Sequence, residues 1–357
     1  MLALMPVTMM DIAKDLNVSV VTVSKVLRNQ GRISEATRKR VLRHAKKLNY
    51  QMNWVARSLV TRRTYTIGLL LPEFAHPFFA DIARAVANTV RPHGYHVVIA
   101  SFEEAPELEA SEVDSLLARQ VDGLIIASAQ SPRRLDMFKR VQERKTPYVL
   151  IDRPIRGLRA CFVGVDNRAI GKMATEHLIA CGRRRIGHLR GPDIGIAADR
   201  LHGYQSALRE AGLRADRNYI VEGGHGDRTG YEGMRKMLKL QPLPDGIFCF
   251  NDPVAIGAMK ASLEAGLRLP HDIAFVGAGN VHYGDALAVP LTSVDQGTCR
   301  IGSEAAELLM ARIASKRPMR PKTILIPPKL MERESTRNDS RAVSSAHGPD
   351  LTGPSRI

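Results

Sequence analysis

The sequence predicts a small all-α head followed by an α/β core of two doubly wound lobes. Over the first fifty residues, apolar positions recur at helical spacing in three short segments. After Thr64 the pattern changes, and apolar runs of four to six residues alternate with amphipathic stretches of ten to eighteen residues. This alternation begins again near residue 164, and two successive α/β series indicate two lobes with a cleft between them.

The head, residues 7–52, has the pattern of a helix-turn-helix domain. A first helix is expected at "DIAKDL", a tight turn at "NVS" and a second helix at "VVTVSKVLRN". Ser34 precedes "EATRKRVL" and is a candidate N-cap of a third helix. The first two helices share an apolar inward face, made of Ile12, Ala13, Leu16, Val23, Val26 and Leu27. The outer, leading face of the second helix would then consist of Val20, Val21, Thr22, Ser24 and Lys25.

Most of the net positive charge of the chain lies in this head and the segment after it. The formal net charge is +16, and residues 1–64 hold thirteen Lys and Arg residues against three Asp and Glu residues. Clusters of Lys and Arg bind phosphates because they displace condensed counterions. Charge and helix spacing together predict that the second helix enters a DNA major groove. A basic three-helix domain that binds protein or RNA is the alternative interpretation.

The core is expected to start with four buried parallel strands, at "TIGLLL", "HVVIAS", "DGLIIAS" and "PYVLID". The second series runs to the strand "IAFVGA", and the helix "GSEAAELLMARIAS" and the strand "TILIP" would return to the first lobe. After about Glu334 the chain is polar and is predicted to be disordered. The expected boundaries are a linker at 53–64, a core at 65–334 with a first lobe at about 65–163 plus 294–330 and a second lobe at about 164–293, and a tail at 335–357.

The sequence lacks the motifs of the enzyme classes that use an α/β cleft. "GHGDRTG" fails the spacing of a dinucleotide loop, "IGKMAT" lacks the upstream glycine of a P-loop, and neither a G-x-S-x-G elbow nor an H-E-x-x-H pair occurs. The four cysteines are far apart, which argues against a zinc module or a disulfide framework. No apolar run approaches the roughly 20 residues that span a bilayer. We therefore expect a cytoplasmic, nucleoid-associated protein without enzymatic activity, cofactor, metal or membrane partner.

The sequence resembles the LacI/GalR family of bacterial transcription regulators from about Val7 to Glu334. The resemblance rests on "DIAKDLNVSVVTVSKVL", "LNYQMNWVARSL", "TIGLLLPEFAHPFFADI", "DNRAIGKMATEHLIACGRRRIGHLRG" and "FNDPVAIGAMKA". It implies a core like that of periplasmic sugar-binding proteins. It also implies a ligand-responsive, sequence-specific repressor that binds a pseudo-palindromic double-stranded DNA operator as a homodimer. The alternative is a sugar-binding protein without a regulatory role on DNA.

The resemblance also assigns roles in DNA binding. It places Val20 and Val21 at the positions that largely set operator preference, and Lys25 at a position where a base-contacting basic residue is frequent. Leu59 matches a leucine that wedges into a central base step when two paired hinge helices form; the alternative is that Leu59 packs on the core. The segment itself is amphipathic but too short to be a stable isolated helix. The expected DNA-binding residues are Ser19, Val20, Val21, Thr22, Ser24, Lys25, Arg28, Asn53, Arg57 and Leu59.

The resemblance further implies an effector site in the cleft. Aromatic rings for stacking, a carboxylate for hydroxyl donors, and Arg and Asn side chains for oxygen acceptors suit a small polar molecule, such as a carbohydrate or sugar derivative. Each residue also has a structural alternative, such as core packing for the two phenylalanines and an Asp152–Arg153 pair. Many sugar-binding relatives carry an aspartate where Gly279 lies, so the pocket is expected to lack one of their usual hydroxyl-binding carboxylates. The expected ligand-binding residues are Phe78, Phe79, Asp152, Arg200, His225, Asn251 and Gly279.

Overall fold

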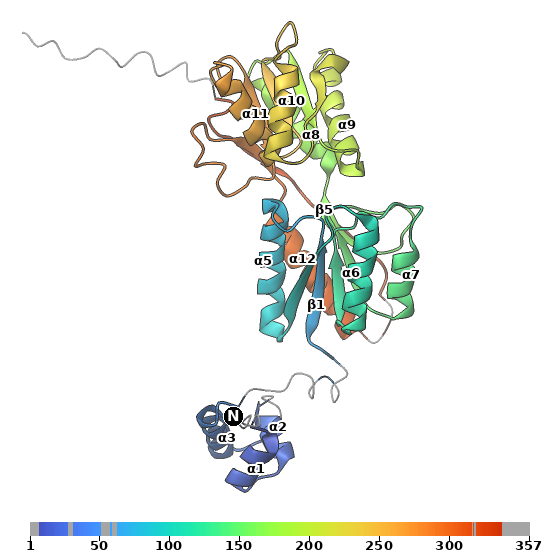
Figure 1. Ribbon diagram of the computed structural model, residues 1–357, viewed down its shortest axis with the longest axis vertical. Coiled ribbons are helices and arrows are strands. Elements are labelled where there is room, and N and C mark those ends of the chain that lie inside the picture. The colour runs from blue at the N-terminus through green and yellow to red at the C-terminus, as the bar shows by residue number, and fades with distance from the viewer. Residues whose placement is uncertain are drawn as a thin grey trace, which may run out of the picture. The chain divides into compact units, whose positions relative to one another are not determined.

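The computed structural model describes residues 7–27, 31–50, 58, 63–315, 317 and 319–337. The chain divides into two compact units, Met1–Thr64 and Tyr65–Ile357. The first is helical, and the second contains two parallel sheets covered by helices (Figure 1). An all-α head and a two-lobed α/β core are therefore confirmed. Within the described residues, no helix is long and apolar enough to cross a membrane.

The described part of the head contains three helices, each begun by a side-chain cap. In the first, Thr8 and Asp11 form a capping box. The N–H of Thr22 donates to Ser19 Oγ at 3.1 Å, and the N–H of Thr37 donates to Ser34 Oγ at 3.3 Å, which confirms Ser34 as an N-cap. The helices are α1 (Met9–Leu16), α2 (Val20–Leu27) and α3 (Glu35–Lys47). Their buried core consists of Ile12, Ala13, Val23, Val26, Val41 and Ala45.

The first lobe is built on a parallel sheet with the strand order β11-β5-β4-β3-β1-β2. Its strands are β1 (Thr66–Leu71), β2 (His96–Ser101), β3 (Gly123–Ile126), β4 (Tyr148–Ile151), β5 (Cys161–Val165) and β11 (Thr323–Ile326). Helices α5 (Pro77–Val90) and α12 (Thr298–Ala314) cover one face, and α6 (Pro106–Ala118) and α7 (Asp136–Glu143) cover the other (Figure 1). β1, β3 and β4 are almost fully buried because both faces of the sheet are covered.

The second lobe has a sheet with the order β12-β10-β9-β8-β6-β7, parallel except for β12. Its strands are β6 (Ile186–Arg190), β7 (Ile220–Glu222), β8 (Gly246–Cys249), β9 (Ala274–Ala278), β10 (Thr292–Asp295) and β12 (Lys329–Met331). Its helices are α8 (Asn167–Ala180), α9 (Gly195–Glu210), α10 (Asp227–Met237) and α11 (Asp252–Glu264). The chain therefore passes between the lobes after β5, after β10 and after β11.

The structure corrects the expected lobe boundaries. β5 extends the first lobe to Val165, and β10 keeps the chain in the second lobe to Asp295, two residues beyond the expected limit of 293. The sequence pattern predicts that the first lobe continues to residue 330, but Lys329–Met331 pairs with β10 of the second lobe. Short apolar segments close to where the chain passes between the lobes have similar sequence patterns. Only strand pairing assigns each of them to one sheet or the other.

The structure also corrects the start of the polar tail. Ser335 and Thr336, expected to be disordered, are buried in the second lobe. The Ser335 hydroxyl donates to Phe275 O at 2.6 Å and accepts from the N–H of Thr292 at 2.8 Å. The small hydroxyl side chains satisfy buried backbone groups, a role that composition alone does not reveal. Residues 338–357 lie outside the described part of the chain.

One buried histidine in the second lobe makes stability sensitive to acid. The His188 ring stacks on Phe248 with centroids 4.6 Å apart, and its Nδ1–H donates to Phe248 O at 2.9 Å. Its Nε2 is buried without a hydrogen-bond partner, and burial lowers the pKa of His188 from 6.5 to about 4. Between pH 4 and pH 6.5, His188 is protonated in the unfolded chain but neutral in the folded chain. The stabilisation is therefore complete above pH 6.5 and is lost as the pH falls toward 4.

We expect His188→Asn to flatten this acid dependence. Asparagine keeps a donor toward Phe248 O but does not titrate. Wild type should lose about 3 kcal/mol of unfolding free energy through His188 between pH 7 and pH 4. Urea titrations of both proteins across that range should show the loss reduced in the variant, since other titrating groups are common to both. Parallel pH profiles would show that His188 is not the cause.

Candidate functional site

The N-terminal turn of α2 presents an unusual apolar surface. Val20 and Val21 are 39% and 61% exposed, whereas Val23 and Val26 on the same helix are buried. Ser19 caps the helix and its Oγ lies 2.8 Å from Thr22 Oγ1. Exposed valines at a helix start can contact thymine methyl groups in a major groove but cannot form hydrogen bonds with base edges. Lys25 is also exposed, whereas Thr22 and Ser24 are half-buried.

Several expected DNA-binding residues cannot be placed. Arg28, Asn53, Arg57 and Leu59 lie outside the described residues, as does most of the linker 53–64. Their assignment to DNA contacts stays a prediction.

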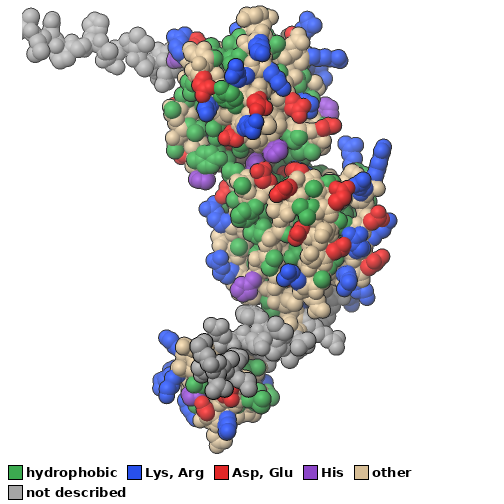
Figure 2. Space-filling view, viewed as in Figure 1, with side chains coloured by type: hydrophobic (Ala, Val, Ile, Leu, Met, Phe, Trp, Pro, Cys, Tyr) green, Lys and Arg blue, Asp and Glu red, His purple; other side chains and the backbone are tan. Residues whose placement is uncertain are grey.

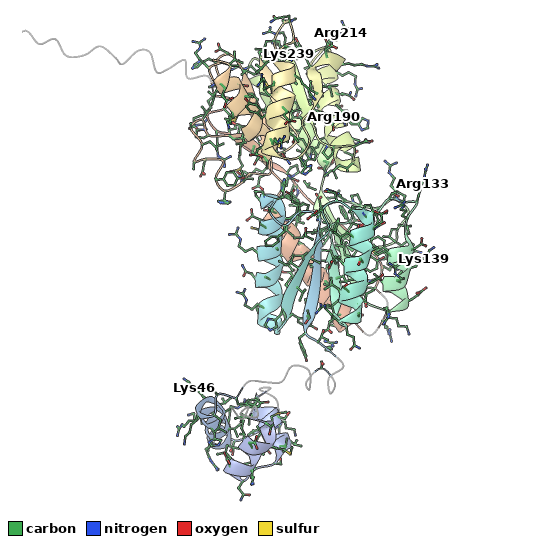
Figure 3. The ribbon with its side chains drawn as sticks, in the orientation of Figure 1. Lys46, Arg133, Lys139, Arg190, Arg214 and Lys239 are labelled. Carbon is green, nitrogen blue, oxygen red and sulfur yellow. The ribbon has the colours of Figure 1, made fainter. Side chains whose placement is uncertain are left out.

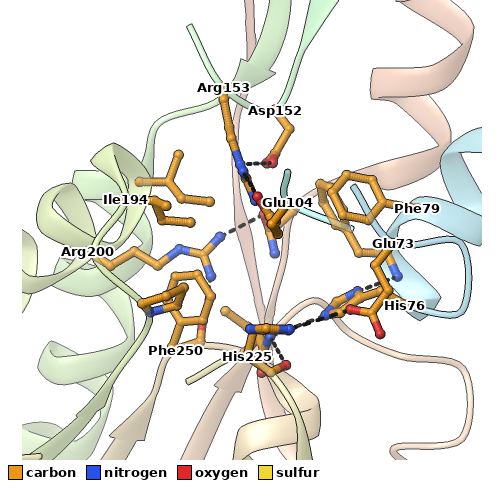
Figure 4. Close-up of a pocket in the computed structure, with 16 residues that line it drawn as sticks. Glu73, His76, Phe79, Glu104, Asp152, Arg153, Ile194, Arg200, His225 and Phe250 are labelled. Atoms are coloured by element: carbon orange, nitrogen blue, oxygen red, sulfur yellow. Dashed lines mark hydrogen bonds and ion pairs between the residues drawn. The ribbon is translucent and has the colours of Figure 1, made fainter. Parts of the chain in front are cut away.

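A cavity of about 60 Å³ lies between the two lobes of the core (Figure 4). Its lining residues come from the segments that follow the carboxyl ends of strands in both sheets and from α5 and α9. This end of the strands is where ligands bind in open α/β folds. Six of the seven expected ligand-binding residues line it: Phe78, Phe79, Asp152, Arg200, His225 and Asn251. The structure thus brings together side chains that lie up to 173 positions apart in the sequence. Their contact with a ligand stays a prediction.

Gly279 is the exception, and it does not line the cavity, although the neighbouring Ala278 does. Its φ is +141° and its N–H donates to Val294 O at 2.9 Å, so the backbone here is held within the second lobe. Without a side chain it cannot reach the cavity. A side chain at this position would start 3.3 Å from the buried carboxylate of Asp252. Gly279 therefore does not line this cavity, and its contact with a ligand stays a prediction.

Arg200 of α9 is the central cation of the cavity. It is 2% exposed, and its guanidinium donates to Asn167 Oδ1 at 2.9 Å, to Gln296 Oε1 at 3.0 Å and to Phe250 O. Its Cζ lies 4.7 Å from the centre of the Phe250 ring, a cation–π contact. Burial lowers the pKa of Arg200 to about 10, against the opposing effects of Asp152 and Asp252, so the group is charged at neutral pH. Its remaining N–H groups can donate to a ligand oxygen.

Asp152 supplies the matching acceptor. It follows β4 with a φ of +63°, a left-handed conformation that is costly for a residue with a side chain and is common at functional sites. Its charge partner is Arg153, whose Nε lies 3.4 Å from Asp152 Oδ2, and the other two nitrogens of Arg153 bind Glu104 at 2.5 and 2.6 Å. Burial raises the pKa of the Asp152 carboxyl, and Arg153 and Arg200 oppose that rise. The side-chain oxygens of Asp152 face the cavity, where they can accept hydrogen bonds from hydroxyl groups.

Two polar contacts join the lobes across the cavity. Asn251 Nδ2 of the second lobe lies 3.2 Å from His76 Nε2 of the first, and it also donates to His225 O at 2.8 Å. His225 Nε2 lies 3.7 Å from Glu73 Oε2. Burial lowers the pKa of His76 to about 4, so its imidazole is neutral at physiological pH. These contacts stabilise the observed arrangement of the two lobes around the cavity.

Sequence reasoning missed several residues of the cavity. Glu73 and His76 follow β1, and Glu104 follows β2, at the same edge of the sheet as the residues that were identified. Inspection of every polar residue after a predicted strand would have found them. The apolar lining of Ile194, Ile196 and Phe250 had no distinguishing pattern, because such residues are equally common in a core.

Two known protein families match parts of this chain. Residues 8–53 match the family described as bacterial regulatory proteins, lacI family, and residues 175–336 match the periplasmic binding protein-like domain. The ribose operon repressor of Halalkalibacterium halodurans is 35% identical over 331 residues, which are 92% of this chain and 97% of that protein. The transcriptional repressor PurR of Actinobacillus pleuropneumoniae is 33% identical over 339 residues, covering 93% and 98%.

The chain belongs to the lacI family of bacterial regulatory proteins. As a LacI-family regulator it is a DNA-binding transcriptional repressor that responds to a small-molecule effector, and not an enzyme. Among solved structures, the Lac repressor dimer bound to operator and the anti-inducer ONPF covers 93% of this regulator and 99% of its own chain, with 27% identity and a TM-score of 0.81. The CelR–cellobiose complex gives 32% identity and a TM-score of 0.70, covering 92% and 99%.

Proposed function

We propose that this LacI-family regulator binds a pseudo-palindromic operator as a homodimer, and that a small polar effector in the cleft controls this binding. The observation that carries the effector site is the pairing of Asp152 and Arg200 across a cavity with aromatic walls. One group accepts and the other donates, which suits an uncharged polyhydroxylated molecule such as a carbohydrate or sugar derivative. The CelR–cellobiose structure supports this class of effector. The site of action would be the cytoplasm, on the nucleoid.

The operator would be read by the exposed start of α2. Ser19, Val20 and Val21 would lie against the groove, with Thr22, Ser24 and Lys25 beside them, and Arg28, Asn53 and Arg57 would add contacts. A valine pair reads methyl groups, so we expect thymines at the corresponding positions of each half-site.

Effector binding would act by a population shift. A ligand that contacts Asp152 in the first lobe and Arg200 in the second has a different affinity for each arrangement of the lobes. It therefore changes their equilibrium by that difference in binding free energy. By linkage, operator DNA changes effector affinity by the same factor.

Two measurements test this proposal. Selection of binding sites from a randomised duplex library should return a short pseudo-palindrome whose affinity falls steeply with salt. A thermal-shift screen of sugars, sugar acids and nucleobases should raise the unfolding midpoint with a polyol, because a ligand that binds only the folded state stabilises it. Failure to select a site would contradict the operator, and stabilisation by nucleobases alone would contradict the carbohydrate class.

We expect Leu59→Ala to weaken operator binding by one or more kcal/mol. Alanine is too small to wedge between two base pairs and kink the duplex. The complex would therefore lose the additional protein–DNA contacts that a bent duplex allows. Fluorescence anisotropy with the selected operator measures the change. Dimerisation and effector binding, measured on the same variant, should be unchanged. Unaltered operator affinity would favour the alternative that Leu59 packs on the core.

The dimer would form through the β2 edge of the first lobe. β2 is an outer strand with Val98 and Ile99 about 40% exposed, and Phe74 beside it is 57% exposed. A groove of about 440 Å³ between α5 and β2 adjoins these side chains. Apolar side chains and an unpaired strand edge are features of self-association surfaces, and the Lac repressor structure is that of a dimer.

We expect Ile99→Asp to weaken self-association at least tenfold, because it buries a charge in an apolar interface. Analytical ultracentrifugation measures the monomer–dimer equilibrium. Leu325→Asp is a matched control, since Leu325 is 54% exposed on β11, the opposite edge of the same sheet. Equal effects of the two substitutions would reject the β2 edge as the dimer surface.

A further inference from the structure

Exposed cations gather at the amino-terminal ends of four strands of the first-lobe sheet. β3, β4, β5 and β11 are neighbouring parallel strands, so the residues that precede them meet at the same edge. Each strand is preceded within four residues by at least one exposed Lys or Arg. We call these six residues the basic edge: Arg119, Arg144, Lys145, Arg159, Arg320 and Lys322.

The basic edge has little counter-charge. In the same four-residue windows the only acidic residue is Asp122, and its carboxylate accepts a hydrogen bond from the N–H of Tyr65 at 3.1 Å. Within the described part of the chain, none of the six cations forms an ion pair, whereas Arg140 nearby pairs with Asp114 at 2.9 Å. At the other end of the sheet, Glu73, Glu104 and Asp152 follow β1, β2 and β4 and line the cleft. Figure 2 shows acidic side chains gathered at this boundary between the lobes.

Helix dipoles do not account for the basic edge by themselves. Arg119 and Arg144 follow the last turns of α6 and α7, where a cation is favoured by about 0.3–1 kcal/mol. The second lobe has the same alternation of strands and helices and therefore offers the same helix ends. Yet the windows before its strands β6, β7, β8 and β9 hold four cations and three acids, and Arg185 there pairs with Asp245 at 3.4 Å. The excess of positive charge is specific to the first lobe.

The basic edge is also where the DNA-binding part of the chain is attached. β1 begins at Thr66 in the same sheet and the same direction, so residue 64 leads directly into this edge. The twelve residues 53–64 span at most about 40 Å even when fully extended. Four strands at about 4.8 Å spacing extend over roughly 15 Å, a length along which duplex DNA carries about nine phosphate charges.

We infer that the basic edge binds the sugar–phosphate backbone of duplex DNA and adds sequence-independent affinity from outside the head. The inference rests on the proposed function, since the head supplies the operator complex in which the edge meets DNA. Exposed Arg and Lys side chains without acidic partners lose no ion pair when they bind phosphates, and their binding releases counterions. These interactions would position the core on the duplex and would not discriminate between bases.

The test compares two triple variants of the full-length protein with equal changes in net charge. The first, Arg119→Glu with Arg144→Glu and Lys322→Glu, reverses half of the basic edge. The second, Arg214→Glu with Lys236→Glu and Lys239→Glu, alters exposed cations of the second lobe, two of which are labelled in Figure 3. Affinity for the selected operator, embedded in a 60-base-pair duplex, is measured by anisotropy from about 0.05 to 0.3 M salt.

The basic-edge variant should bind at least tenfold more weakly than the second-lobe variant at physiological salt. Its slope of log affinity against log salt should be shallower, by about 0.9 for each phosphate that the variant no longer neutralises. Base preference in a competition with mutated operators should be unchanged. A triple Arg119→Gln, Arg144→Gln and Lys322→Gln variant should also bind the operator more weakly than the second-lobe variant, but by a smaller factor. This variant keeps the inference testable if the charge-reversed protein does not fold.

Equal affinities and slopes for the two variants would overturn the inference and would leave an acidic protein surface as the partner of the basic edge. The proposed function would stand in that case, because both variants would still bind the operator specifically. By contrast, a wild-type protein that binds no duplex specifically would contradict the proposed function itself.

Discussion

Replacing Arg200 with methionine should abolish the response to effector and lower the unfolding free energy by about 3 kcal/mol. The guanidinium connects Asn167 at the start of α8, Phe250 after β8 and Gln296 after β10. Methionine fills a similar volume but leaves these buried acceptors without their donors. The cavity would also lose the cation opposite Asp152. Urea denaturation measures the first effect, and titration calorimetry with the effector from the thermal-shift screen measures the second.

Arg209→Met provides the control on the same helix. Arg209 is exposed in the last turn of α9, and its Nη2 lies 3.2 Å from Ser206 Oγ, so its loss should change stability by less than about 0.5 kcal/mol. A further Arg200→Lys variant separates charge from geometry, because lysine keeps the charge but cannot reach three diverging acceptors. Full effector response in Arg200→Met would show that the cavity is not the effector site.

Gly257→Ala should destabilise the second lobe by about 3 kcal/mol or more. This is the opposite of what helix propensity predicts, since alanine is about 1 kcal/mol more favourable than glycine in a helix interior. The Cβ of an alanine would lie only 1.8 Å from the carbonyl oxygen of Asp227 in the neighbouring helix α10. The contact is reciprocal, since a Cβ at Gly230 of α10 would lie 2.2 Å from Val254 O of α11. The two helices would have to separate and expose their packed surface.

Gly195→Ala is the matched control, because a Cβ at this first residue of α9 would meet no atom within 4 Å. It should be neutral or slightly stabilising. Thermal denaturation of the three proteins measures both effects. A Gly257→Ala variant as stable as wild type would show that α10 and α11 can separate at little cost.

The same close packing recurs at the other helix pair of the lobe. A Cβ at Gly171 of α8 would lie 2.0 Å from Arg200 O, and one at Gly203 of α9 would lie 2.1 Å from Arg168 O. Gly171, Gly203, Gly230 and Gly257 lie inside helical patterns, where helix propensity alone counts glycine as unfavourable. Only the packed pairs explain them, since each glycine lets a facing backbone approach.

The residues of the cleft could be predicted only in part from the sequence. Phe78, Asp152, Arg200 and Asn251 could be identified from the resemblance because each lies in a recognisable motif. Gly279 also lies in such a motif, but it has no side chain and does not line the cavity. Arg153 was foreseen as a partner of Asp152, and the structure adds that it binds Glu104 as well.

The sequence by itself determined the helical head, the alternation that builds two lobes, and the regulator family. Hydrophobic periodicity, charge clustering and local motifs depend on neighbouring residues and are therefore readable along the chain. Only the tertiary structure decided which sheet holds β10 and β12, that Ser335 and Thr336 are buried, and that cations preceding four separate strands form one basic edge. These features depend on residues far apart in sequence, whose proximity is set by strand order and packing.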